Sequence, residues 1–141
     1  MSTPLYLRPT AIAAVAIGGL IGAPARYALG LSVNYQHWPV ITFVINVVGA
    51  FLLGMLLEAL TRLGPDSGWR QRLRLTLGTG VLGSFTTYSA LAVDTDLLLR
   101  ANRLWAATTY AIGTVAAGVL ATAVGIAVGA RLTARNGARA A

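Results

Sequence analysis

Hydrophobic residues fall into four long runs along the chain. The predicted spans cover residues 10–31, 39–60, 74–98 and 104–130, and short stretches with glycine, proline or charged residues separate them. Each run reaches the roughly 20 residues that a helix needs to cross a hydrocarbon core about 30 Å thick. The pattern therefore predicts an all-α membrane protein with four transmembrane helices, which form a single domain over residues 1–141.

Composition supports a membrane protein and excludes several other classes. Charged residues make up 11% of the chain and hydrophobic residues 56%, and the mean hydropathy is +0.69. A soluble domain usually carries about 25% charged residues. There is no cysteine, and the single histidine, His37, excludes a multi-histidine metal site. The sequence shows no ATP-binding motif and no catalytic constellation, so we do not expect an enzyme.

All eleven basic residues are arginine, and their positions indicate membrane topology and lipid-headgroup contact. With four crossings, both termini and the 61–74 loop lie on one side, which holds eight arginines against three on the other. Positive residues concentrate on the cytoplasmic side, so we expect a multi-pass protein of the inner (plasma) membrane with both termini in the cytoplasm. The apolar runs leave no basic soluble face for nucleic acid.

Polar residues in the second and fourth runs place hydrogen-bonding groups at membrane depth. Thr42, Asn46 and Gly49 are spaced by four and three residues, so they share one helical face. Tyr110 and Thr114 are spaced by four. The Asn46 amide and the hydroxyl groups can replace the hydration shell of an anion, or they can join neighbouring helices through hydrogen bonds. The pattern leaves both interpretations open.

The third run contains a predicted break in its helix. Gly78, Gly80 and Gly83 are followed by SFTTYS at 84–89, and each glycine costs about 1 kcal/mol in a helix interior relative to alanine. A break frees backbone groups that must face protein, an ion or water. Freed carbonyl groups bind cations and freed N–H groups bind anions. The alternative is a straight helix whose hydroxyl groups donate to carbonyls of the preceding turn.

Two glycine pairs and one arginine are further candidates. The pairs Gly18/Gly22 and Gly125/Gly129 have the spacing that lets helix backbones approach closely in lipid. We expect them to pack within the chain, and a subunit interface is the alternative. Arg26, in the first run, either attracts anions at a pore mouth or extends toward lipid headgroups.

Three motifs resemble those of the CrcB/Fluc family of fluoride channels. They are GGLIGAPARY at 18–27, TFVINVVGAFLLG at 42–54 and GSFTTYS at 83–89. Their order and the four-run layout also match, so the resemblance covers essentially the whole chain. It implies a fluoride-selective channel that exports fluoride from the cytoplasm by passive conduction. In this family two subunits assemble in antiparallel orientation, and the pores form at the dimer interface.

The resemblance also implies a set of site residues. A structural sodium ion would lie at the centre of the dimer, held by the backbone carbonyls of Gly83 and Thr86 in the broken third helix. Arg26 would lie in a vestibule. The residues implied along the fluoride path are Thr42, Asn46, Tyr88, Tyr110 and Thr114.

Two positions depart from the family's pattern. The third helix of the family usually carries two phenylalanines that face the pore, and Tyr88 and Leu91 stand at those positions here. Leu91 has no ring, whose electropositive edge can accompany an anion. Together with the arginine asymmetry, this leaves open both a homodimer and a pore-poor subunit that pairs with an oppositely oriented family member.

A small cation- or proton-coupled exporter is the competing class of transport protein. Such proteins generally need an acid within the membrane. The uncharged stretch of the third run ends near Val93, so the sequence places all four acids, Glu58, Asp66, Asp94 and Asp96, at or beyond the ends of apolar segments. This placement favours the channel.

Overall fold

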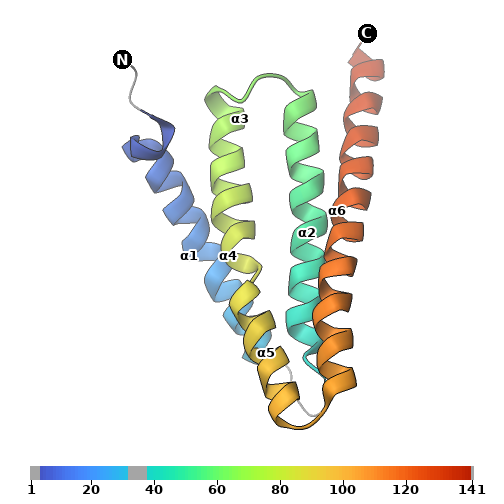
Figure 1. Cartoon of the computed structure of the whole chain (residues 1–141). Helices are drawn as coiled ribbons and strands as arrows, with labels where there is room; N and C mark the ends of the chain where they lie inside the picture. Colours follow the sequence, from blue (N-terminus) through green and yellow to red (C-terminus); the bar gives the residue numbers. More distant parts are fainter. Residues whose placement is uncertain (1–3, 32–37, 141) are drawn as a thin grey trace.

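Helices account for every regular element of the computed structural model, which describes residues 4–31 and 38–140, with side chains through residue 134. His37 lies outside the described residues. The elements in chain order are η1 (Leu5–Leu7), α1 (Pro9–Leu31), α2 (Val40–Arg62), α3 (Gly68–Leu73), η2 (Arg74–Leu82), α4 (Gly83–Phe85), α5 (Tyr88–Arg100) and α6 (Leu104–Ala140) (Figure 1). The chain is therefore an all-α protein, as its hydrophobic pattern predicts.

Within the described ranges, three helices are each long and apolar enough to cross a membrane. They are α1, α2 and the part of α6 from Leu104 to Ala134. The predicted third span, residues 74–98, is instead divided among η2, α4 and α5. None of these three pieces is long enough to cross a membrane alone.

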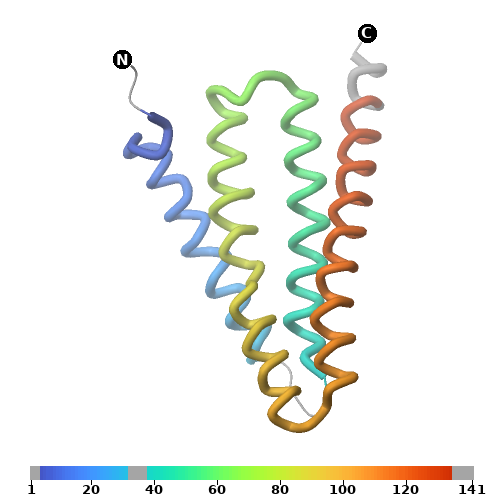
Figure 2. Tube along the Cα trace, in the orientation of Figure 1, coloured from blue at the N-terminus to red at the C-terminus, as the bar shows by residue number. Residues whose placement is uncertain are grey.

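The third helical segment changes backbone conformation at Thr86 and Thr87. Up to Phe85, α3, η2 and α4 follow one another directly as a single rod, in which η2 has the wider π-helical geometry (Figure 2). Thr86 then has φ −73° and ψ 158°, and Thr87 has φ −151° and ψ 123°, both extended. The Thr87 hydroxyl accepts the Ala90 N–H at 3.1 Å and so caps the start of α5.

Two helix pairs provide most of the packing. The helix α1 packs on η2, and α2 packs on α6, alongside which it runs in Figure 2. A Cβ atom at Gly18 would meet the Thr76 carbonyl oxygen, and one at Gly125 would meet the Phe51 carbonyl oxygen. Glycine at these positions thus permits backbone-to-backbone contact, and both glycine pairs pack within the chain as expected.

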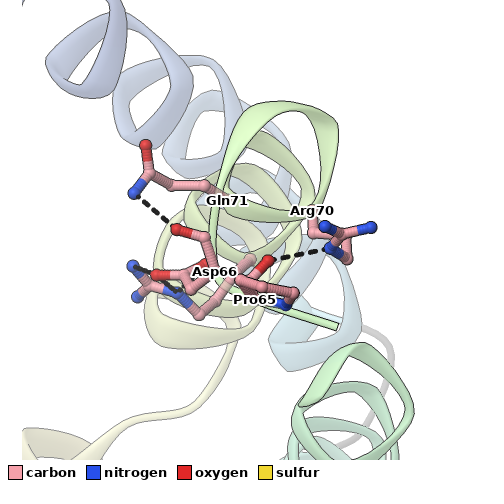
Figure 3. Close-up of polar contacts among 5 residues, drawn as sticks. Pro65, Asp66, Arg70 and Gln71 are labelled. Atoms are coloured by element: carbon pink, nitrogen blue, oxygen red, sulfur yellow. Dashed lines mark hydrogen bonds and ion pairs between the residues drawn. The ribbon is translucent and has the colours of Figure 1, made fainter. Parts of the chain in front are cut away.

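Both chain ends and the α2–α3 loop lie at one end of the molecule (Figure 1). In the loop, Arg70 Nε donates to the Pro65 carbonyl at 2.8 Å and Gln71 Nε2 donates to the Asp66 carbonyl at 3.1 Å (Figure 3). The guanidinium of Arg74 donates to both carboxylate oxygens of Asp66. This ion pair lowers the pKa of Asp66 below its ordinary value.

The expectation that Asp94 lies at or beyond the end of an apolar segment is wrong, because α5 continues past it to Arg100. The connection to α6 is a tight turn in which Asn102 adopts a left-handed φ of 56°. Asp94 therefore lies inside a helix. Its spacing of three from Leu91 and four from Leu98, both buried, places it on the inner face of α5.

Candidate functional site

The centre of the candidate site is a pair of hydrogen bonds between Asn46 of α2 and the backbone of Thr87. The Asn46 Nδ2 group donates to the Thr87 carbonyl at 2.9 Å, and the Thr87 N–H donates to Asn46 Oδ1 at 2.8 Å. A side-chain amide has the same donor and acceptor pair as a peptide group, so one residue satisfies both polar groups of the extended backbone. Asn46 thus joins α2 to the interruption between α4 and α5.

The interruption also removes the helical donors of two backbone carbonyls. In an unbroken α-helix the Thr87 N–H would donate to the carbonyl of Gly83, four residues earlier. Here it donates to Asn46. The Ala90 N–H, the regular donor for the Thr86 carbonyl, donates to the Thr87 hydroxyl instead. Gly83 and Thr86 therefore carry carbonyl oxygens that lack their usual helical partners.

A groove of about 320 Å³ opens beside this interruption, with a mainly apolar wall that carries several polar side chains. Its walls come from α2, the Thr86–Thr87 segment, the start of α5, and α6. Its polar lining residues are Asn46, Thr86, Thr87, Tyr88, Thr114 and Thr122. We call this cavity the Asn46 groove. The structure thus gathers Asn46, Thr86, Tyr88 and Thr114 of the predicted site along one surface.

Tyr88 and Leu91 line the Asn46 groove in different ways. The Tyr88 side chain is 82% exposed, whereas Leu91 is only 8% exposed. Leu91 belongs to a core cluster with Leu98, Ala107 and Tyr110. An aromatic ring at position 88 is therefore free to contact an ion or another subunit, while position 91 serves mainly to pack α5 against α6.

Thr42 and Tyr110 bind a carboxylate at one end of the site. The Thr42 hydroxyl donates to Asp94 Oδ2 at 2.8 Å, and the Tyr110 hydroxyl donates to the same atom at 3.1 Å. Both donors are buried, and the Tyr110 ring packs edge-on against Trp38 with centroids 5.2 Å apart. These contacts join α2, α5 and α6. The hydrogen atoms of both hydroxyls are thereby directed at Asp94.

The remaining predicted residues lie in separate surroundings. The Thr114 hydroxyl donates to the Tyr110 carbonyl of its own helix at 2.6 Å, and its side chain is 3% exposed. Arg26 lies on α1, whose residues do not contribute to the Asn46 groove. Its Nε atom is buried, without a hydrogen-bond partner among the described residues.

Asp94 is the site residue that the sequence interpretation undervalued. Its charge, directly after Val93, favours a position at the end of the third apolar segment, whereas the structure places it within α5. The signal that identifies it is the helical spacing of Leu91, Asp94 and Leu98, which continues the apolar face of α5 through the acid. A half-buried carboxylate on such a face needs donors, and Thr42 and Tyr110 provide them.

The apolar helices and the groove with polar side chains at an interrupted helix define an integral membrane protein with a site inside its helical bundle. A family model described as CrcB-like protein, Camphor Resistance (CrcB), matches residues 13–126. This stretch includes the Asn46–Thr87 contact and the whole of the Asn46 groove. The chain belongs to the CrcB family.

Several curated proteins are similar to the chain over most of its length. One is "Fluoride-specific ion channel FluC 2" of Leifsonia xyli subsp. xyli, 48% identical over 99% of this chain and 97% of that protein. "Fluoride-specific ion channel FluC" of Novosphingobium aromaticivorans is 44% identical over 84% of this chain and 95% of that protein. The protein of the same name from Deinococcus radiodurans is 40% identical over 94% of this chain and 100% of that protein. These relatives are ion channels by name rather than enzymes.

Proposed function

We propose that this chain forms a fluoride-selective ion channel that conducts fluoride passively out of the cytoplasm. Membership of the CrcB family and the names of its relatives support the choice of ion. The observation that carries the proposal is the interruption at Thr86–Thr87, which Asn46 holds beside a groove lined by hydroxyl and amide groups among apolar side chains. An ion path needs polar groups at membrane depth, and backbone freed from a helix provides them.

Fluoride is small and strongly hydrated, so its path must offer compact N–H or O–H donors in place of water. The Asn46 amide has two hydrogen atoms, and only one is needed for the Thr87 carbonyl. The second can donate to an anion in the Asn46 groove. Tyr88 can contribute a hydroxyl hydrogen and a ring edge, because its side chain is exposed there.

Asp94 sets the electrostatics at the end of the path. A carboxylate repels an anion, but Thr42 and Tyr110 both donate to one of its oxygens. The two hydroxyl groups therefore stabilise the carboxylate and direct their positive dipole ends toward its negative charge. Thr42 and Tyr110 act on the path through Asp94 in this arrangement rather than by donating to fluoride directly.

A structural sodium ion at the interruption is the second part of the proposal. Carbonyl oxygens are the ligands that alkali cations prefer in membrane proteins. The Gly83 and Thr86 carbonyls fit this role, because their regular helical donors are used elsewhere. The ion would supply positive charge at the centre and hold the freed carbonyls in place.

The proposed assembly is an antiparallel dimer in which the broken third segments of two subunits meet and each contributes both carbonyls. The Asn46 groove is open along one side of the single chain, and the exposed Tyr88 ring at its edge suits contact with a second copy. A second subunit would close the groove into a pore. We place this dimer in the plasma membrane and propose that passive export protects the cell from fluoride.

Leu91 favours a homodimer over a pore-poor subunit. Its side chain is buried against Tyr110 within the same chain, so the missing ring alters the core more than the exposed wall of the groove. The arginine asymmetry still favours one orientation in the membrane, with both termini in the cytoplasm. Antiparallel pairing then requires that a minority of copies insert with the opposite orientation.

Ion release from liposomes that contain only this chain tests the proposed selectivity. Liposomes loaded with equal concentrations of fluoride and chloride as potassium salts should release fluoride and retain chloride once a potassium ionophore supplies the compensating current. Release of both ions at similar rates would contradict a fluoride-selective path. Retention of both ions by correctly folded, dimeric protein would contradict the channel itself.

A further inference from the structure

Two cavities share a wall at the end of the molecule that carries the chain termini. One is a polar pocket of about 210 Å³, and the other is a largely apolar groove of about 580 Å³. Leu5, Ala11 and Leu75 line both. We call them the arginine pocket and the lipid groove. Together they form one continuous depression between η1, α1 and the α3–η2 rod.

The arginine pocket has an excess of positive charge. Arg8 and Arg72 line it, and no acid does so among the described residues. The two acids at this end of the molecule are already engaged, since Glu58 pairs with Arg62 and Asp66 pairs with Arg74. Arg72 is exposed and forms no hydrogen bond or ion pair with any residue that the structure describes. A phosphate group suits this pocket.

The lipid groove begins at the arginine pocket and follows α1 and η2 into the apolar part of the fold. Its apolar walls include Tyr6, Ile12, Val15 and Ala16. The stretch from Ala11 to Ala16 corresponds to about 8 Å of helix. This depth accommodates part of a hydrocarbon chain whose polar end remains at the arginine pocket.

Aromatic side chains indicate that this region lies at the level of lipid headgroups. Tyr6 is 75% exposed and Trp69 is 54% exposed. Tyrosine and tryptophan concentrate at the membrane–water interface, where their rings contact both lipid and water. The arginine pocket therefore lies where a phospholipid phosphate lies, and the lipid groove points toward the acyl chains.

We propose that this depression binds one anionic phospholipid. Arg8 and Arg72 bind the headgroup phosphate, and the lipid groove holds an acyl chain against α1 and η2. The shared wall distinguishes this site from a simple phosphate pocket, because it places an apolar channel next to the two arginines. The site is separate from the Asn46 groove, since no residue lines both.

Native mass spectrometry of the full chain in detergent, titrated with dioleoylphosphatidylglycerol, measures this binding. The Arg8→Gln/Arg72→Gln variant should bind the first lipid about thirty-fold more weakly, because each arginine contributes about a factor of five near an anionic headgroup. The control variant Arg62→Gln/Arg131→Gln removes the same charge at the same end and should bind as the unmodified chain does. Dioleoylphosphatidylcholine should bind weakly to all of them.

A second pair of variants tests the lipid groove. Ala16→Trp fills the groove and should weaken phosphatidylglycerol binding at least tenfold, whereas Ala13→Trp, also exposed on α1 but outside the groove, should have no effect. Equal loss in both arginine variants would show attraction by net charge alone and overturn the site. Displacement of the lipid by glycerol phosphate, without any effect of Ala16→Trp, would identify a free-phosphate pocket instead.

Discussion

Asn46 binds the backbone of Thr87 at two points, with Nδ2 2.9 Å from the Thr87 carbonyl oxygen and Oδ1 2.8 Å from the Thr87 nitrogen. The sequence left two roles open for this asparagine, donation to an ion and connection of two helices. The contact establishes the connection and leaves one amide hydrogen for an ion. The two roles are therefore compatible in one side chain.

Replacing Asn46 by aspartate should abolish fluoride efflux and lower the free energy of unfolding by about 1–3 kcal/mol. The carboxylate cannot donate to the Thr87 carbonyl, and it adds a negative charge beside the anion path. Efflux from liposomes and thermal unfolding in detergent measure the two effects. The control is Asn102→Asp, the same chemical change in the α5–α6 turn. Wild-type efflux from the Asn46→Asp protein would show that Asn46 does not line the path.

Gly49 lets α2 approach the interruption closely, because a Cβ atom there would overlap Thr86 Cγ2. Gly49→Ala should therefore lower the free energy of unfolding by about 1–3 kcal/mol. Adding Thr86→Ser removes Cγ2 and keeps the hydroxyl that donates to the Leu82 carbonyl. The double variant should recover most of the loss.

Gly19→Ala is the matched control for the Gly49 substitution, since a Cβ atom at Gly19 meets nothing within 4 Å. This change should leave stability unchanged or raise it by up to about 1 kcal/mol. If Thr86→Ser gives no recovery in the Gly49→Ala background, the Gly49–Thr86 contact does not limit the approach of α2.

Sodium should stabilise the dimer in a way that larger monovalent cations do not. Protein prepared without sodium should show a rising thermal midpoint as sodium is added, equivalent to about 2.7 kcal/mol at a hundred times the dissociation constant. The Thr86→Ser variant should respond equally, because the proposed ligand is a backbone carbonyl. Identical midpoints in sodium and in N-methylglucamine at equal ionic strength would argue against the cation site.

The Asp66–Arg74 ion pair should stabilise the fold at neutral pH and lose this effect only in acid. Its hydrogen bonds lower the folded-state pKa of Asp66 below the ordinary value of 3.8, so its contribution is complete above that pH and is lost as the pH falls through the folded value. The contribution is at most about 1 kcal/mol, because the pair is partly exposed. Asp66→Asn should reduce this acid-dependent loss of stability. An effect of the same substitution that appears only above pH 5 would contradict the assignment.

Much of the fold follows from local pattern. The apolar runs predict α1, α2 and α6, since a run of about 20 apolar residues has few alternatives to a helix in lipid. The glycines and threonines of the third run also pointed to Thr86–Thr87, where the extended backbone lies. The local sequence does not specify the π-helical geometry of η2, which lies against α1 at Gly18 and Gly22.

The hydrogen-bond partners of the site were harder to predict, because they depend on which helices meet. Thr42 and Asn46 share a face of α2, yet one binds Asp94 and the other binds Thr87, 41 residues away along the chain. The local spacing of residues on α2 does not specify either of these partners, because both lie far away along the chain. The predicted position of Asp94 was wrong for a related reason. Its charge suggested the end of a helix, but the buried face formed by Leu91 and Leu98 continues past it.

The most direct test of the channel is fluoride efflux from liposomes that contain this chain alone, measured with a fluoride electrode with and without a potassium ionophore. A passive channel moves net charge, so efflux should be negligible until the ionophore supplies a compensating potassium current. It should then proceed without any pH gradient. Efflux that needs no ionophore and follows an imposed proton gradient would identify a coupled exporter and contradict the account.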